Sequence, residues 1–561
     1  MVPMSDFFSL LGAPVTFSES GTGQELNLKN RTTGMNLSRT LATSLLAISM
    51  TLSAAAQNGN TIGVVRDDGG TQTGYWLFAP LRSNPSTSLL TNDTYLMDNE
   101  GRVVNQWESP FRPGNSVYLT PEGDLIRTMN PGNASTISAG GAGGLIERRD
   151  WAGELEWSFS HISDSYRLHH DVELLPNGNI LCIAWESKSA AEALAAGRMP
   201  GTFGDSLWPD KIIEVQPDGR SGGAIVWEWH AWDHLVQYLS PDYPNYGDPA
   251  RNPRRINLNY RASNSSDWMH CNGLDYNAEL DQIMISSRTF NEIWIIDHGT
   301  TTEEAAGPAG DLMYRWGNPE AYARGSGKDR RFFGQHDAKW IRPGMPGYPG
   351  FTVFNNGNGR PGIPYSSIDE VMPPILRDGT YRLDLIDPFG PAESSWTYVA
   401  PIPSNFYSGF ISGAQRQRNG NTLICSGATG NIFEVDSDGT EIWRYIVPLD
   451  ENGPMTQGET PSSGGGAGAN GANTVFRAER YELDFEGFIG KDMTPGMTIE
   501  LSFEPPCSAD LNGDSNVDGA DAGLLLALWG ESGAGDLNGD GTTNGADIGL
   551  MLAAWGACGT P

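Results

Sequence analysis

Four histidines in polar contexts are the residues of this chain best suited to chemistry. They lie in three short segments, Leu168-His169-His170-Asp171, Asp267-Trp-Met-His270-Cys-Asn272 and Phe333-Gly-Gln-His336-Asp337. Arg288 lies between the second and third segments. An imidazole can transfer protons near neutral pH or attack as a nucleophile, and a guanidinium binds oxyanions. If the fold gathers these side chains, we expect an anion site with a nucleophile and a base in reach.

The other four histidines, His161, His230, His234 and His298, are interpreted as hydrogen-bonded structural residues. A transition-metal site is the alternative for the first set. Its members are separated by about 100 and about 66 residues, form no His-x-His pair, and have Asp171 and Asp337 as the only obvious carboxylates beside them. Acid–base and nucleophilic chemistry is therefore the leading hypothesis.

A repeated turn-and-strand pattern indicates how these segments are positioned. A turn centred on x-Gly-x precedes an apolar strand at 121–127, 176–182 and 419–425, and a second turn leads to a strand ending in Trp at 150–157, 218–227 and 436–443. Four-stranded units of about 50 residues are typical of an all-β propeller. Six blades fit best, with five or seven as alternatives. Inner strands of all blades meet around one channel, so distant residues can share a site.

Composition excludes several classes of partner. The 561 residues include 36 Lys and Arg against 68 Asp and Glu, a formal charge of −32. General binding to nucleic acid or to an anionic membrane is therefore not expected. Seventeen Trp, 70 Gly and 36 Pro favour many short strands joined by turns.

Residues 1–56 are predicted to be a leader. A basic start at Met35–Arg39 precedes about 15 mostly apolar residues and Ala54-Ala55-Ala56, the pattern of a secretory signal peptide. We place the true start at Met35; a short core helix or an uncleaved membrane anchor is the alternative. No other apolar run reaches the ~18 residues of a spanning helix. We expect a secreted protein, periplasmic or at the cell surface, with no membrane insertion after signal cleavage.

The acidic segment 507–561 contains a duplicated 12-residue loop, which begins at Asp510 and again 26 residues later at Asp536. Calcium prefers six to eight hard oxygens, and such loops supply them from side chains and from the carbonyl of position 7. Each loop precedes an apolar helix pattern, so we predict a small α-helical module with two EF-hand-like calcium loops. A solvated acidic repeat without metal is the alternative. The predicted ligands are Asp510, Asn512, Asp514, Asn516, Asp518, Asp521, Asp536, Asn538, Asp540, Thr542, Asn544 and Asp547. Cys507 and Cys558 flank the module and could join its ends in an oxidising compartment.

Several ordered motifs resemble the bacterial arylsulfotransferase family, the PAPS-independent aryl-sulfate sulfotransferases. They lie at 169–179, 267–276, 286–298, 312–319, 333–338 and 355–361, and the resemblance extends from about residue 75 to 500. It implies a six-bladed propeller that moves a sulfuryl group from a phenolic sulfate donor to a phenol acceptor. No nucleotide cofactor is implied.

The same resemblance implies roles for individual residues. His336 matches the family's nucleophile, which becomes a sulfohistidine. His270 and Asn272 match its His-x-Asn motif, and Arg288 matches its sulfate-binding arginine. The first family histidine corresponds to His169 or His170; we favour His170, because strand alternation directs only one of the two into the channel. Arg360 is a further candidate for substrate binding.

The C-terminal repeat resembles a type I dockerin, which implies a calcium-folded module that docks on a cohesin-like partner; attachment to a cell surface is an equal alternative. We therefore predict three parts: a leader at 1–56, a propeller sulfotransferase domain at 57–506 and a dockerin-like module at 507–561. Rival functions are a non-catalytic extracellular binding propeller, a polysaccharide hydrolase or lyase, and a sulfatase.

Overall fold

The computed structural model describes residues 60–81, 92–132, 135–261, 265–450, 452–461, 473–501, 508–514 and 516–557. The predicted leader, Cys507 and Cys558 lie outside these ranges. Signal cleavage and the pairing of the two cysteines therefore stay predictions.

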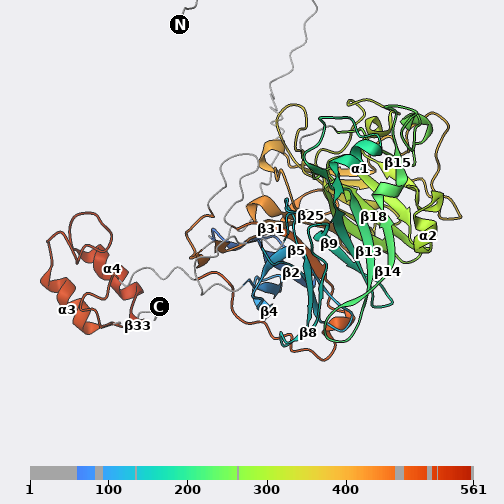
Figure 1. Ribbon diagram of the computed structural model, residues 1–561. Helices are drawn as coiled ribbons and strands as arrows, with labels where there is room; N and C mark the ends of the chain where they lie inside the picture. Colours follow the sequence, from blue (N-terminus) through green and yellow to red (C-terminus); the bar gives the residue numbers. More distant parts are fainter. Residues whose placement is uncertain are drawn as a thin grey trace, which may run out of the picture. The chain divides into compact units, whose positions relative to one another are not determined.

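Six antiparallel sheets form a six-bladed β-propeller in the part of the chain that the structure describes, which confirms the predicted all-β architecture (Figure 1). From the inside outward, the first blade contains β31 (Val475–Tyr481), β2 (Tyr75–Pro80), β3 (Thr94–Met97) and β4 (Val103–Trp107), and the second contains β5 (Arg112–Leu119), β6 (Leu125–Asn130), β7 (Leu145–Arg149) and β8 (Leu155–Ser160). The third blade contains β9 (Tyr166–Leu174), β10 (Ile180–Glu186), β13 (Asp210–Pro217) and β14 (Gly223–His230), and the fourth contains β17 (Cys271–Asn277), β18 (Gln282–Ser287), β19 (Glu292–Asp297) and β20 (Tyr314–Trp316). The fifth blade contains β21 (His336–Trp340), β22 (Phe351–Asn355), β23 (Ser367–Val371) and β24 (Trp396–Tyr398), and the sixth contains β25 (Gly413–Arg416), β26 (Thr422–Ser426), β27 (Asn431–Val435), β28 (Glu441–Ile446) and β1 (Gly63–Asp67).

The ring is closed at two places by strands from opposite ends of the propeller sequence. Strand β1 is the outermost strand of the sixth blade, and β31 is the innermost strand of the first. Neighbouring inner strands contact one another all the way around the axis. Radial closure leaves few exposed strand edges, which explains why so many short strands can form one stable unit.

The tryptophans that end the outer strands join each blade to the next. Trp107 Nε1 donates to Asp150 O at 2.8 Å, and Trp157 Nε1 donates to Gly222 O at 2.8 Å. Trp229, Trp316 and Trp443 repeat this contact in the third, fourth and sixth blades. Of the strand-end tryptophans in the sequence, Trp157 and Trp443 therefore make a contact between blades, in which the N–H satisfies a carbonyl of the neighbour. In the third blade Trp229 makes this contact, and Nε1 of Trp227 has no hydrogen-bond partner among the described residues.

Four inner strands contain β-bulges, and three of these strands contain or directly follow the histidines predicted to form the site. The pairing register shifts within β5, β9, β17 and β21. Beside these shifts His170, His270 and Asp337 have positive φ angles of 52°, 51° and 51°. A bulge re-aims a side chain, and such backbone strain concentrates at functional sites.

The connections between the blade strands contain two short helices, α1 (Ala190–Ala195) and α2 (Thr302–Ala305). They also contain three short strand pairs: β11 (Lys188–Ser189) with β12 (Ser206–Leu207), β15 (Leu235–Val236) with β16 (Ile256–Asn257), and β29 (Leu449–Asp450) with β30 (Gly453–Pro454). Across the described ranges, none of the helices has the length and apolar character needed to span a bilayer.

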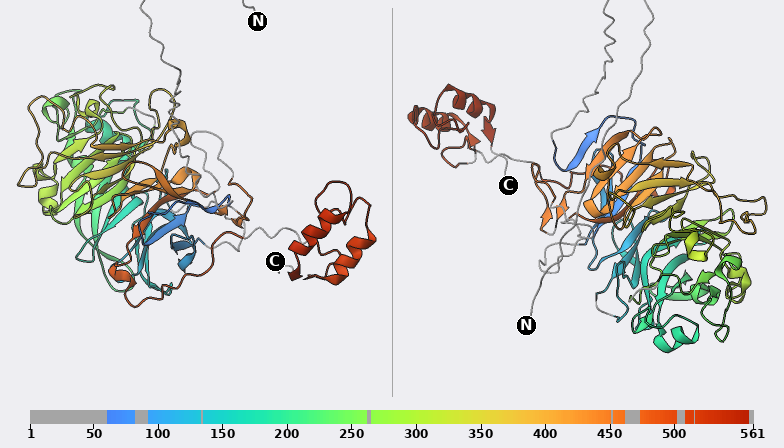
Figure 2. Two further views of the ribbon diagram at one scale, coloured as in Figure 1. Left: turned by 180° about the vertical axis from the view of Figure 1, so that it is seen from behind. Right: turned by 90° about the horizontal axis from the view of Figure 1, so that it is seen from above.

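The C-terminal module contains two helices that lie side by side, α3 (Gly519–Ala527) and α4 (Gly545–Ala553), and a short strand pair, β32 (Asn516–Val517) and β33 (Gly556–Ala557) (Figure 2). Its buried apolar residues include Val517, Leu525 and Met551. Asp518 and Asn544 cap the two helices with equivalent hydrogen bonds, so the repeat in the sequence is a repeat in the structure.

Candidate active site

The inner strands of the third, fourth and fifth blades bring three of the predicted histidines together. The rings of His170 and His270 are in edge contact, with centroids 4.6 Å apart. His336 is close enough that His270 and Arg288 both influence its pKa. The side chains expected to share one site therefore lie around the propeller axis, although they are up to 166 residues apart in the sequence.

His169 and His170 have different surroundings. His170 lies against His270, whereas His169 stacks on Trp185 with ring centroids 3.9 Å apart. The two Nδ1 atoms are 2.9 Å apart, and Asp210 Oδ1 lies 2.9 Å from His169 Nε2. The structure thus places His170 beside the other catalytic candidates and His169 directly behind it.

Gly141 allows His170 to occupy its place. The His170 N–H donates to Gly141 O at 2.8 Å, and a Cβ on Gly141 would lie 2.1 Å from Cε1 and Nε2 of the ring. Gly141 also has φ +80°, which a glycine adopts without steric strain. Any side chain at this position would displace the imidazole.

His270 is held by a carboxylate from its own connection. Asp267 Oδ2 lies 2.5 Å from His270 Nδ1, and Trp185 Nε1 donates to Asp267 Oδ1 at 3.1 Å. Burial raises the pKa of Asp267, but His270 and the hydrogen bonds outweigh it and the net pKa is lowered. Ionised Asp267 therefore keeps a proton on Nδ1 and leaves Nε2 of His270 for exchange with a ligand.

His336 is fixed in one tautomer by Asn356. The Asn356 amide nitrogen donates to Ser408 O and Ile411 O, so its Oδ1, 2.7 Å from His336 Nδ1, must accept. The proton of His336 is on Nδ1, and Nε2 carries a lone pair. Ile411 N–H, held at φ +48°, donates to this Nε2 at 3.2 Å.

Burial keeps two of the imidazoles neutral. It lowers the pKa of His170 well below the ordinary value, and His270, His169, His336 and Arg288 lower it further. Burial also lowers the pKa of His336, with Arg288 the next cause, and the hydrogen bond that His336 donates to Asn356 acts against them. A neutral imidazole with a lone pair on Nε2 is the form that can act as a nucleophile.

Arg288 is a guanidinium without a protein partner. It is half buried, beside Gly334, and its side chain makes no hydrogen bond or ion pair with any described residue. Burial lowers its pKa, against which Asp267 acts. Since buried charges are normally paired, an unpaired arginine among imidazoles is suited to bind an anion.

Asn272 and Arg360 both make contacts with protein groups. Asn272 Nδ2 donates to Gln335 O at 2.8 Å and so holds the residue that precedes His336. Arg360 donates to Tyr365 Oη and to Ser367 Oγ, and it lies over the ring of Phe333. We interpret both as positioning contacts on the fifth blade and its neighbour.

The remaining histidines are away from the site and have partners. His161 stacks on Tyr166, His230 pairs with Glu186 and Glu228, His234 with Asp311, and His298 with Glu214 and Asp281. The carboxylate partners of His230, His234 and His298 agree with the hydrogen-bonded structural role expected from the sequence, whereas Nε2 of His161 is buried without a hydrogen-bond partner among the described residues.

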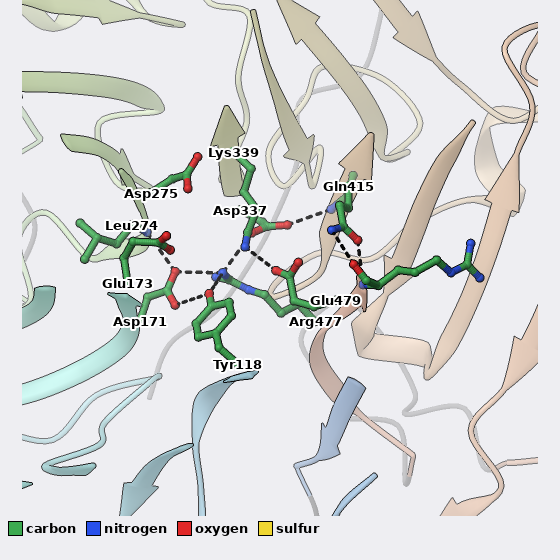
Figure 3. A network of polar contacts seen from close by, with 12 residues as sticks. Tyr118, Asp171, Glu173, Leu274, Asp275, Asp337, Lys339, Gln415, Arg477 and Glu479 are labelled. Carbon is green, nitrogen blue, oxygen red and sulfur yellow. Dashed lines mark hydrogen bonds and ion pairs between the residues drawn. The ribbon is translucent and has the colours of Figure 1, made fainter. Parts of the chain in front are cut away.

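A second polar cluster is centred on Arg477 of β31 (Figure 3). Arg477 Nη1 contacts Asp171 Oδ2 at 2.9 Å and Asp337 Oδ1 at 3.0 Å, and it donates to Tyr118 Oη at 2.8 Å. Asp171 also accepts from Leu274 N, and Asp337 accepts from Ala414 N. All six inner strands contribute to this cluster, which we call the hub. The carboxylates next to the histidines in sequence thus bind Arg477 and are not partners of the imidazoles.

The two C-terminal loops share one pattern of hydrogen bonds. Asp521 accepts from Leu511 N and Asn512 N through Oδ1 and from Asp518 N through Oδ2, and Asp547 repeats this in the second loop. These bonds lower the pKa of both carboxyls. Within the described ranges no three His, Cys, Asp or Glu side chains are gathered for a metal. The donor set of carboxylate and amide oxygens nevertheless fits calcium chemically.

Four residues of the site escaped the sequence analysis: Asp210, Asp267, Asn356 and Arg477. Of these, Asp267 carried a usable signal, because it precedes His270 by three residues. Asp210 and Asn356 come from other strands or connections and are indistinguishable in sequence from ordinary turn or strand-end residues. Their roles depend on the contacts between blades.

Comparisons with known proteins were made for the whole chain. The family model described as arylsulfotransferase (ASST) matches residues 83–453. A search of curated proteins found no match. Among solved structures, the chain is similar to a protein from Lactobacillus plantarum (9% identity, TM-score 0.37, covering 73% of this chain and 100% of the other). It is also similar to virginiamycin B lyase from Staphylococcus aureus (10% identity, TM-score 0.31, covering 69% and 88%). Similarities at this level carry no argument about function.

Proposed function

We propose, from the premise that this chain belongs to the arylsulfotransferase (ASST) family, that it transfers a sulfuryl group between phenols by way of a sulfohistidine. The donor would be a phenolic sulfate ester and the acceptor a second phenol, with no nucleotide involved. The observation that carries this proposal is the unpaired Arg288 among three imidazoles, two of which burial keeps neutral.

Arg288 would bind the sulfuryl oxygens of the donor. Its planar set of N–H donors matches such oxygens and opposes the charge that builds up on them during transfer. Local charge matters here, because the net charge of −32 repels anions at long range but is screened over about 8 Å in physiological salt.

His336 would act as the nucleophile. Its Nε2 lone pair forms a bond to sulfur while the bond from sulfur to the aryl oxygen breaks, and the phenolate leaves. Ile411 N–H, which now donates to Nε2, would lose that acceptor and become free to donate to a sulfuryl oxygen. In the second step the acceptor oxygen attacks sulfur and the bond from nitrogen to sulfur breaks, which restores His336.

One proton must reach the departing phenolate and one must leave the acceptor phenol. His270 and His170 are in ring contact, and each has an Nε2 with no hydrogen-bond partner among the residues that the structure describes. Either ring can therefore exchange a proton with a phenol in the channel. Tyr407, which is half buried and near enough to influence the pKa of Arg288, would be a candidate to contact the aryl ring.

Incubation with p-nitrophenyl sulfate, with and without phenol, tests the proposal. We expect p-nitrophenol release that phenol stimulates, formation of phenyl sulfate, and a sulfuryl adduct on the peptide that contains His336, detected by mass spectrometry. Release that is independent of phenol would identify a sulfatase. Absence of both release and adduct would favour a non-catalytic binding propeller.

We further propose that the C-terminal module binds calcium through the twelve loop residues named above, and that the protein is secreted. The duplicated loops and their equivalent hydrogen bonds support the first proposal. Calcium titration of the full chain by calorimetry should show two sites, and Asp510→Ala with Asp536→Ala should remove them. N-terminal sequencing of protein recovered from outside the cytoplasm tests the second.

A further inference from the structure

Behind His170 lies a chain of polar contacts that ends at a buried carboxylate. His170 Nδ1 is 2.9 Å from His169 Nδ1, and His169 Nε2 is 2.9 Å from Asp210 Oδ1. The side chains of His169 and Asp210 are 0% and 1% exposed, so water does not intervene freely. Three groups from β9 and β13 thus connect the site to the body of the third blade.

The contacts determine where the protons lie. Within the described part of the chain, Asp210 Oδ1 and His169 Nε2 have no partner other than each other, although they are not aligned as an ideal hydrogen bond. Two lone pairs at 2.9 Å in a buried site would repel each other, so Nε2 of His169 carries a proton. The second oxygen of Asp210 accepts from Cys271 N at 2.9 Å, so this oxygen already has its hydrogen bond and Oδ1 is the one that faces His169.

The proton on His169 Nε2 leaves a lone pair on its Nδ1 when the ring is neutral. His170 Nδ1 must then carry a proton that it donates to His169, and its Nε2 has a lone pair. No described residue donates to this Nε2. The chain therefore presents an unprotonated nitrogen next to His270.

We propose that Asp210, His169 and His170 form a proton relay that accepts the proton of the incoming phenol. This inference rests on the proposed function and deepens it. As the phenol oxygen attacks sulfur, its proton passes to His170 Nε2, and the proton on His170 Nδ1 passes to His169 Nδ1. The positive charge then resides on His169, paired with Asp210, and His170 stays neutral. The proton returns by the reverse path to the next phenolate that leaves.

The relay resolves a conflict in the electrostatics of the site. Burial and the nearby His270, His169, His336 and Arg288 oppose a positive charge on His170, so this ring alone would be a poor base. His169 faces Asp210, with Asp267 also nearby. Transfer of the positive charge from His170 to His169 therefore places it near two carboxylates, Asp210 and Asp267. Asp210 and His169 are positioning residues in this scheme, since neither touches the phenol.

Asp210→Asn changes the shape of the side chain little, but it should switch the ring nitrogen that carries the proton in both His169 and His170. The new amide N–H would face His169 Nε2, which would move the proton of His169 to Nδ1 and leave His170 with a protonated Nε2. We expect sulfuryl transfer to phenol to fall by about 10²-fold. The loss should shrink along a series of increasingly acidic acceptor phenols, because those acceptors are already ionised. His169→Phe, which keeps the stacking on Trp185, should behave in the same way.

Glu228→Gln is the matched control, because Glu228 pairs with His230 at 3.2 Å in the same blade but outside the site. It should leave transfer unchanged. A loss in Asp210→Asn that is equal for all acceptors would overturn the relay, since a purely structural defect does not depend on acceptor acidity. Wild-type protein that forms no sulfuryl adduct would overturn the proposed function instead.

Nitrogen NMR of the histidine rings tests the relay without any activity measurement. We expect a protonated Nε2 for His169 and a protonated Nδ1 for His170 in the wild type, and the opposite pair in Asp210→Asn. A wild-type His169 with its proton on Nδ1 would overturn the proposal even if the enzyme transfers sulfuryl groups as expected.

Discussion

The propeller axis has two polar layers that differ in one respect. In the hub, every blade contributes and Arg477 is shared by Asp171, Asp337 and Tyr118 (Figure 3). In the layer of imidazoles, only three blades supply histidines, and Arg288 and the Nε2 atoms of His170 and His270 have no protein partner among the described residues. The charged groups of the hub are paired with one another, whereas Arg288 in the imidazole layer has no such partner among the described residues.

The difference separates groups that maintain geometry from groups that we propose to react. Burial opposes the charge of Arg477, but Asp171 and Asp337 outweigh it and raise its pKa well above the ordinary value, so it stays charged and bound. Burial lowers the pKa of Arg288, and no carboxylate of the described ranges forms an ion pair with it. Removal of a hub residue should therefore act on folding, and removal of an imidazole should act on turnover.

The largest expected effect is that of His336→Ala. Without the nucleophile no sulfohistidine can form, and we expect transfer from p-nitrophenyl sulfate to phenol to fall by at least about 10⁴-fold. The free energy of unfolding, measured in urea, should change little by comparison with activity. Full transfer in this variant would reject His336 as the nucleophile.

Arg477→Met should show the opposite pattern. It leaves Asp171 and Asp337 buried without their cation, which costs about 3–5 kcal/mol of unfolding free energy. Arg418→Met is the control: Arg418 is 58% exposed and pairs with Glu482 and Asp484, and such a surface pair contributes less than about 1 kcal/mol. Both unfolding free energies are measured in urea. Equal decreases in Arg477→Met and Arg418→Met would show that the hub contributes no more to stability than a surface ion pair.

Asn356→Ala should reduce turnover by about 10²-fold, because His336 is then no longer restricted to the tautomer with a lone pair on Nε2. Asn358→Ala, two residues away, removes only a bond to Gly409 O and serves as the control. The comparison is made on kcat for transfer and on the yield of sulfuryl adduct. A KM change with unchanged kcat would assign Asn356 to binding.

The smallest effect concerns stability at acid pH. The pKa values of His170 and His336 are lowered in the folded chain, and burial lowers that of His161 to about 4. The unfolded chain takes up protons at these sites below about pH 6.5, so their contribution to stability is complete above that pH and is lost as the pH falls. His161→Phe keeps the stacking on Tyr166. In this variant the decrease in unfolding free energy between pH 7 and pH 5 should be smaller by about 1–2 kcal/mol. An unchanged slope in urea unfolding would contradict a neutral His161.

Much of the propeller could be predicted because its signal is local and repeated. The turn segments at 121–127, 176–182 and 419–425 lead into β6, β10 and β26, each the second strand of a blade, and the segments ending in Trp lead to β8, β14 and β28. The arylsulfotransferase family was also identified correctly. Each of these signals depends on neighbours within about ten residues.

The partners of the histidines could not be predicted in the same way. Asp171 and Asp337 are adjacent in sequence to His170 and His336, yet the bulges in β9 and β21 direct them down to Arg477. The residues that do hold the imidazoles include Asp210 and Asn356, 41 and 20 positions from the histidines that they contact. A bulge reverses the side to which a residue points, and strand alternation alone does not reveal it.

Closure of the first blade by β31 sets the order in which the protein can mature. This strand ends at Tyr481 and carries Arg477, so the ring lacks both its final inner strand and its central cation until some 480 residues of the sequence have been synthesised. The central channel therefore cannot form during most of synthesis, because β31 is still missing from the ring. The imidazoles reach their final arrangement only after nearly the whole propeller sequence has been synthesised.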